Sequence, residues 1–136
     1  MNDRLRIDAV DPAEELAALL DFNEIKYRRY GTAFRFRLSD KGLVWETLCH
    51  AHGGAVLIYG VYPFAAADAM RGKIDEVNAE LTSGAFFTRH GRLVLRTSAD
   101  LFDAYAAYEA IGRALEYNAG AMVAFWPVFQ SLISLA

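Results

Sequence analysis

The sequence contains one short run of side chains that could bind a metal ion, Cys49-His50-Ala51-His52. If this run is a strand, His50 and His52 share one face with Glu46, and Cys49 points to the other face. Two imidazoles are then available, but no third ligand stands at a diagnostic spacing. We expect the exposed end of a hairpin, with Cys49 packed as a small apolar side chain and no metal or cofactor. Whether His50 and His52 bind a metal stays open.

A second candidate is a basic segment in which charged and aromatic residues are interleaved. Its cations are Lys26, Arg28, Arg29, Arg35 and Arg37. Such a segment on a sheet suits single-stranded nucleic acid, because charges follow phosphates and rings stack on bases. However, if Phe34 and Phe36 face the core, the arginines beside them face solvent without the rings. The pI near 5.6 also argues against nucleic acid, so we expect a charged outer face, or a guarded edge strand, that favours an acidic protein segment.

Residues for covalent or phosphate chemistry form no recognisable motif. Ser98 lies in no nucleophile-elbow sequence, and the glycines are scattered rather than gathered in a phosphate-binding loop. We therefore predict that the chain is not an enzyme.

The composition is typical of one packed domain. The chain has 136 residues, 54% of them hydrophobic, and a net charge of -3, which suits a single core. One cysteine suits a reducing compartment. Residues 1–16 carry no apolar signal region, and the longest apolar run, residues 119–129, is far shorter than the roughly 20 residues of a membrane span. We expect residues 1–136 to form a single cytoplasmic domain without a membrane partner.

Hydrophobic periodicity predicts an α+β fold. Asp11 and Pro12 begin a helix that ends near Phe22, and the period then changes to two until residue 62. A helix over about 64–81, a hairpin over 85–97 and a long C-terminal helix follow. The expected order is helix, three-stranded antiparallel meander, helix, β-hairpin and helix, with a fourth strand if Gly31 is a turn. Whether the last helix breaks at Gly120 or Pro127 stays open.

The strand over residues 55–64 is apolar on both faces, which predicts that both faces are covered. We expect the first and last helices to cover one face, and the other face or the middle helix to mediate self-association or to bind a partner polypeptide. The candidate interaction surface is Leu57, Tyr59, Val61, Met70, Ile74, Val77 and Asn78. Which face the helices cover is not decided. Gly60 would allow a bulge or the close approach of another backbone.

Two further features lie along the C-terminal helix. Asn118 falls in its apolar stripe, and a buried amide needs partners, either at a strand end or across a dimer, unless it lies at the margin of the stripe. Aromatic residues near Trp126 and Tyr62 could line a small-molecule pocket, although aromatics at helical spacing usually form core.

The segment from the central strand to the second hairpin resembles the YbjN-like family, which shares its fold with type III secretion chaperones. The residues that carry the likeness are Tyr62-Pro63-Phe64, residues 74–81 (IDEVNAEL), Gly84-Ala85-Phe86 and residues 90–96 (HGRLVLR). Asn78 matches the second member of the family's paired asparagines, whereas Asp75 stands in place of the first. The resemblance implies a non-enzymatic regulatory domain that is commonly a dimer, and it supplies no catalytic residues.

These observations lead to three hypotheses. The first is a protein-interaction or chaperone-like regulatory module that forms a homodimer. The second is single-stranded nucleic-acid binding through residues 26–37. The third is small-ligand binding in an aromatic pocket. The identity of the partner and the biological process are not encoded in any pattern that we recognise.

Overall fold

The computed structural model describes residues 11–101 and 106–133. The elements in chain order are α2 (Pro12–Phe22), β1 (Tyr27–Tyr30), β2 (Ala33–Asp40), β3 (Leu43–His52), β4 (Ala55–Ala65), α3 (Asp68–Glu80), β5 (Ala85–Arg89), β6 (Arg92–Asp100) and α4 (Ala107–Ile133). The predicted α+β class and the predicted order of elements are confirmed. Gly31 has a φ of 62° and forms the turn between β1 and β2, so the first part of the sheet is a four-stranded meander.

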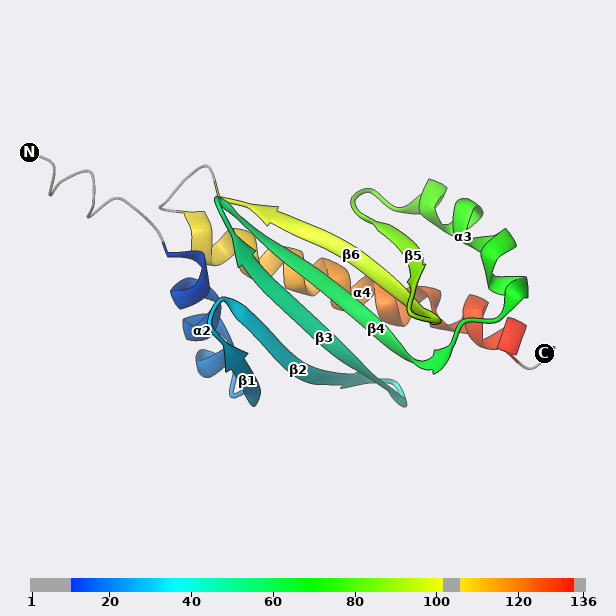
Figure 1. Ribbon diagram of the computed structural model, residues 1–136, viewed down its shortest axis with the longest axis horizontal. Helices are drawn as coiled ribbons and strands as arrows, with labels where there is room; N and C mark the ends of the chain where they lie inside the picture. Colours follow the sequence, from blue (N-terminus) through cyan, green and yellow to red (C-terminus); the bar gives the residue numbers. More distant parts are fainter. Residues whose placement is uncertain (1–10, 102–105, 134–136) are drawn as a thin grey trace, which may run out of the picture.

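The strands form one antiparallel sheet in the order β1-β2-β3-β4-β6-β5 (Figure 1). Lys41-Gly42 and His90-Gly91 close two of the hairpins with positive φ at both residues, which is the geometry that matches the right-handed twist of the strands. The second hairpin joins the sheet through β6, which pairs with β4, so β5 lies at the edge of the sheet. This arrangement places β4, the strand that is apolar on both faces, inside the sheet.

The described helices gather on one side of the sheet. In Figure 1, α4 crosses behind the strands, and α3 lies beyond β5 at the edge. The inward residues of α3, Met70 and Val77, are buried in the same cluster as Phe129 of α4. The middle helix therefore extends the helical layer and does not cover the second face of the sheet.

The core has two apolar halves. One half joins α2 to β2, β3 and the start of α4, and the other joins α3, β5 and β6 to the end of α4. Between them lie three buried polar residues, Thr47, Thr97 and Asn118. The polar side chain of Asn118 therefore marks the middle of the helix–sheet interface.

Candidate interaction surface on the open sheet face

The face of the sheet opposite the helices carries an apolar strip. By strand register its residues point away from α2 and α4; they are Val44, Leu48, Leu57, Tyr59, Val61 and Val94, of which Val94 is buried at 4% exposure. Val44 is 51% exposed and Leu48 is 39% exposed, although both are aliphatic side chains of β3. Leu48, Tyr59, Val61 and Val94 line a hollow of about 550 Å³. We call this surface the open face and these six residues the apolar strip.

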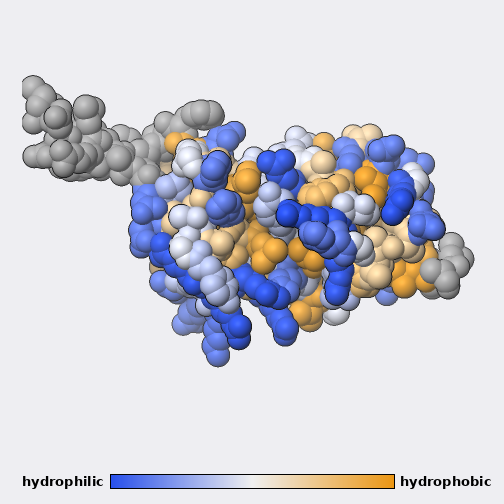
Figure 2. Space-filling view, in the orientation of Figure 1, coloured by the Kyte–Doolittle hydropathy of each residue, from blue (hydrophilic) through white to orange (hydrophobic). Residues whose placement is uncertain are grey.

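Arginines stand on both sides of the apolar strip. Arg28, Arg35 and Arg37 come from β1 and β2, and Arg89, Arg92 and Arg96 come from β5 and β6. In the described strands the acids that share this face are Glu46 and Asp100. Figure 2 looks onto this face and shows hydrophobic residues near its middle, with hydrophilic residues between and around them. The open face is therefore basic although the whole chain has a net charge of -3.

One of these six arginines already has an anionic neighbour on the open face. Arg35 forms an ion pair with Glu46 and both side chains are partly exposed. Arg37 lies directly opposite Glu46 in the register of β2 and β3. One carboxylate thus faces two guanidinium groups, which leaves positive charge in excess on this side of the strip.

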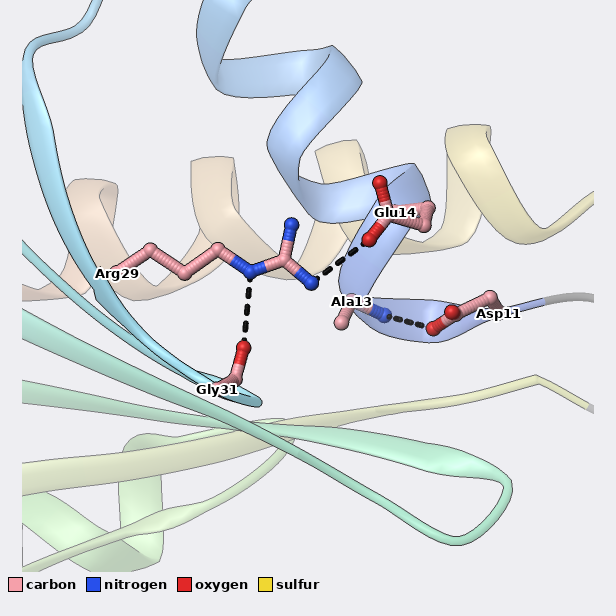
Figure 3. Close-up of polar contacts among 5 residues, drawn as sticks. All are labelled: Asp11, Ala13, Glu14, Arg29 and Gly31. Carbon is pink, nitrogen blue, oxygen red and sulfur yellow. Dashed lines mark hydrogen bonds and ion pairs between the residues drawn. The ribbon is translucent and has the colours of Figure 1, made fainter.

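The predicted basic segment divides between the two faces. Arg28, Arg35 and Arg37 lie on the open face, and exposed Lys26 lies just before β1. Arg29 points to the helical side, where it donates to Glu14 of α2 at 2.7 Å and to the Gly31 carbonyl at 2.8 Å (Figure 3). The Glu14 carboxylate raises the pKa of Arg29 further, because it stabilises the charged guanidinium. Arg29 therefore ties β1 to α2 and does not belong to the open face.

Most aromatic rings of the basic segment do not lie on the open face beside its arginines. Phe34 and Phe36 are 1% and 4% exposed and belong to the core on the helical side. Tyr30 does lie on the open face, where it is 62% exposed. Alternation thus separates most of the rings from the charges, as the sequence pattern predicts.

The predicted interaction surface also divides into two groups. Leu57, Tyr59 and Val61 lie together in the apolar strip. Met70 and Val77 are buried in the core, at 0% and 2% exposure, so they are not part of a surface, and Ile74 packs half-buried against the same cluster.

Asn78, the remaining member of that predicted surface, has a structural role. Its side chain accepts a hydrogen bond from the Phe86 backbone N–H at 2.7 Å and donates one to the Phe86 carbonyl at 3.1 Å. It thereby supplies the pairing that a neighbouring strand would give to the outer edge of β5. The neighbouring Asp75 is exposed.

Gly60 makes room for side chains of α4 and not for the second backbone that we expected from the sequence. A Cβ atom there would come 2.7 Å from Asn118 Oδ1 and 2.9 Å from Met122 Cγ. The missing side chain thus admits side chains of α4, not another backbone. Asn118 donates from Nδ2 to the Ile58 and Leu95 carbonyls at 3.4 and 3.3 Å and to Thr97 Oγ1 at 3.1 Å, so its partners lie within the chain.

The cysteine–histidine run follows the expected alternation. The rings of His50 and His52 lie 5.7 Å apart at the end of β3, and Cys49 is buried on the helical side. Burial raises the pKa of the Cys49 thiol to about 12, so at neutral pH it is an uncharged thiol, which is a poor ligand and nucleophile. Residues 11–101 and 106–133 contain no group of three or more potential metal ligands.

The aromatic residues near Trp126 form a packed cluster. Tyr62 lies 5.7 Å from the Trp126 ring and 5.3 Å from the Phe64 ring, and its hydroxyl donates to the Met122 carbonyl at 2.7 Å. Burial raises the pKa of Tyr62 as well. Tyr62 and Trp126 both line a hollow of about 400 Å³, but Tyr62 is 0% exposed and holds α4 on β4.

Sequence reasoning missed the second row of arginines. Arg92 and Arg96 alternate with Leu93 and Leu95, which is a signal that the charged positions of β6 share one face. What could not be read is that β6 pairs with β4, which brings these arginines beside Tyr59 and Val61.

The sequence matches no protein-family model and no curated protein. The structure is similar to the crystal structure of YbjN from E. coli, a proposed transcription regulator, with a TM-score of 0.58 and 11% sequence identity over 82% of this chain and 89% of that one. At this identity the likeness concerns the fold, and it confirms the fold that the family resemblance implies. It names no ligand or partner for either protein.

No helix in the described part of the chain is long and apolar enough to span a bilayer.

Proposed function

We propose that this chain is a non-enzymatic, chaperone-like regulatory module that binds a partner polypeptide on its open face. The observation that carries the proposal is the apolar strip in the middle of a sheet face that no described helix covers. Contiguous exposed apolar surface framed by polar residues is typical of a protein-interaction site. The described regulatory role of YbjN is consistent with such a module.

Single-stranded nucleic acid is the alternative that the arginines favour. Most side chains of the apolar strip are aliphatic, however, whereas sequence-independent binding of single strands uses aromatic rings as stacking platforms. A polypeptide makes better use of Val44, Leu48 and Val61 than a row of bases does. Substitutions separate the two candidates. Binding of nucleic acid should be lost when the arginines are replaced, but it should be retained when Val44 and Leu48 become serine.

The proposal is tested by affinity capture from native lysate with identification by mass spectrometry. The wild-type chain should retain a specific polypeptide, and V44S/L48S should lose it. A124S changes an exposed apolar residue of α4 on the helical side and should behave like wild type. Circular dichroism checks that all three proteins are folded. Capture of nucleic acid, or of the same proteins by wild type and V44S/L48S, would overturn the proposal.

We also propose that the chain forms a homodimer. The groove between α2 and α4 holds Phe22, 80% exposed, and Tyr108. Its charged residues are of both signs, Glu109, Arg113 and Glu116, so two copies related by a two-fold axis can place unlike charges opposite each other. This groove is on the helical side, so a dimer through it leaves the open face accessible.

A further inference from the structure

We infer that the partner segment on the open face is an acidic amphipathic α-helix. The inference rests on the proposed function and adds the conformation and charge of the occupant. It is carried by the width of the apolar strip, the length of the open face along the strands, and the excess of arginines over carboxylates on this face.

The width of the strip suits a helix. Arg35, Leu48, Tyr59 and Arg96 lie directly opposite one another on the four consecutive strands β2, β3, β4 and β6. Three strand spacings of about 4.8 Å separate the two arginines, roughly 14 Å in all. A helix with its side chains is about 10–12 Å across, so it fits between the rows with its apolar stripe on Leu48 and Tyr59. An extended strand is too narrow to reach both rows at once.

The length of the face suits a helix of three to four turns. The register of β6 from Arg92 to Ser98 spans six residue steps, which corresponds to roughly 20 Å. A helix of about 13 residues covers the same distance. Over that length an amphipathic helix presents apolar residues at every third or fourth position and flanking residues on both sides.

The charge of the face selects acids on those flanks. Six arginines face two carboxylates, and Arg28, Arg37, Arg89 and Arg96 form no ion pair among the described residues. Glutamate or aspartate on both flanks of the bound helix would meet these guanidinium groups and could accept two hydrogen bonds from each. The whole chain has a net charge of -3, so the surface outside the open face is negative. That surface repels an acidic segment, whereas the open face attracts it.

The same charges disfavour a second copy of this chain as the occupant. A two-fold interface brings the same patch of both copies together. Across the open face it would place arginine rows against arginine rows, with few carboxylates to separate them. A partner of opposite charge meets no such repulsion.

The probe for a test is a fluorescein-labelled peptide of about 15 alanine-rich residues with a leucine stripe and glutamate on both flanks. Fluorescence anisotropy should detect binding to the wild-type chain that weakens at least about tenfold between about 0.05 M and 0.5 M salt. Two control peptides carry lysine in place of glutamate, or the same residues in an order that destroys the stripe. Both should bind at least about tenfold more weakly.

Charge reversal of one arginine in each row gives the sharpest comparison. R37E/R96E should lose at least about tenfold in affinity for the glutamate peptide and gain affinity for the lysine peptide. The matched control, R71E/K41E, changes the net charge equally at exposed positions on α3 and in a turn, and it should stay within about twofold of wild type. A merely destabilised variant would lose both peptides and would not gain the second.

Three results would overturn the inference. They are equal binding of the glutamate and lysine peptides, equal binding of the stripe and scrambled peptides, and tighter binding of a single-stranded oligonucleotide than of any peptide at the same salt. If no peptide binds while V44S/L48S still loses a captured polypeptide, the inference fails and the proposed function stands. If V44S/L48S loses nothing, the proposed function fails.

Discussion

Gly60 and Asn118 depend on each other at the centre of the helix–sheet interface. The amide of Asn118 donates to two strand carbonyls and a threonine hydroxyl, and it reaches them because no side chain stands at position 60. A buried amide that satisfies several acceptors fixes the position of α4 along β4 and β6 more specifically than apolar contacts would. The register between helix and sheet therefore rests on one residue pair.

Gly60→Ala should lower the free energy of unfolding by about 1–3 kcal/mol, because the new methyl group overlaps Asn118 Oδ1 and Met122. Urea denaturation measures the change. The controls are Gly72→Ala in α3 and Gly120→Ala in α4, where an added Cβ has no neighbour within 4 Å. Both controls should raise stability by roughly 0.5–1 kcal/mol through helix propensity. An alanine at position 60 that is tolerated like the controls would contradict this account.

Cys49 makes the stability depend on pH in the alkaline range. Burial raises the pKa of its thiol from 9.0 to about 12 in the folded chain, so the folded state holds its proton where the unfolded state has released it. The contribution of the protonated thiol to the free energy of unfolding is fully present below pH 9. It declines between pH 9 and about pH 12, because the unfolded chain releases the proton there and the folded chain does not. The free energy of unfolding should fall by up to about 1.4 kcal/mol per pH unit more in the wild type than in C49A. Parallel pH profiles of the two proteins would show that the thiol does not contribute.

At the scale of elements, α4 is continuous from Ala107 to Ile133 although Pro127 lies inside it. Pro127 cannot donate a backbone hydrogen bond to the preceding turn, and its ring crowds that turn. The helix persists because Met122, Phe129 and their neighbours are held in the core beside Tyr62 and Phe86. Packing on the sheet thus outweighs the local cost of the proline.

Because Pro127 is itself exposed, its replacement removes little packing. Pro127→Ala should therefore raise the free energy of unfolding by about 1–3 kcal/mol. Thermal and urea denaturation against wild type would measure it, with Ala124→Pro, an exposed site one turn earlier, expected to destabilise by about 3 kcal/mol. A loss of stability in P127A would mean that the proline fits a bend that the core requires.

The elements were predictable from the sequence where a local signal sets them. Asp11-Pro12 begins α2, and period-two alternation assigns Phe34 and Phe36 to the core. The pairing of β6 with β4 was not predictable, because a hairpin can dock on a sheet through either strand and no local pattern distinguishes them. For that reason the sequence does not predict that Arg89, Arg92 and Arg96 lie on the open face. The inward position of Met70 and Val77 was misjudged because a helical stripe does not tell which neighbour it packs on.

At the scale of the whole molecule, the two sides of the sheet have different surfaces. The helical side carries charges of both signs around Phe22 and Tyr108, whereas the open face carries six arginines around an apolar strip. A surface with charges of both signs can meet its own copy, and a surface with a large excess of one sign is better matched to an unlike partner. We therefore propose that self-association and partner binding use opposite sides of the molecule.

If the two surfaces are separate, substitutions should remove self-association without removing partner binding, and the reverse. Light scattering at micromolar concentration should give a dimer for the wild type and for V44S/L48S, and a mass near 15.1 kDa for Phe22→Ser, which removes the most exposed apolar side chain of the groove. Phe22→Ser should still bind the acidic peptide, since no residue of the open face is changed. A wild-type monomer would exclude the dimer. A dimer that dissociates in V44S/L48S but not in Phe22→Ser would place self-association on the open face, against the repulsion that its arginines impose.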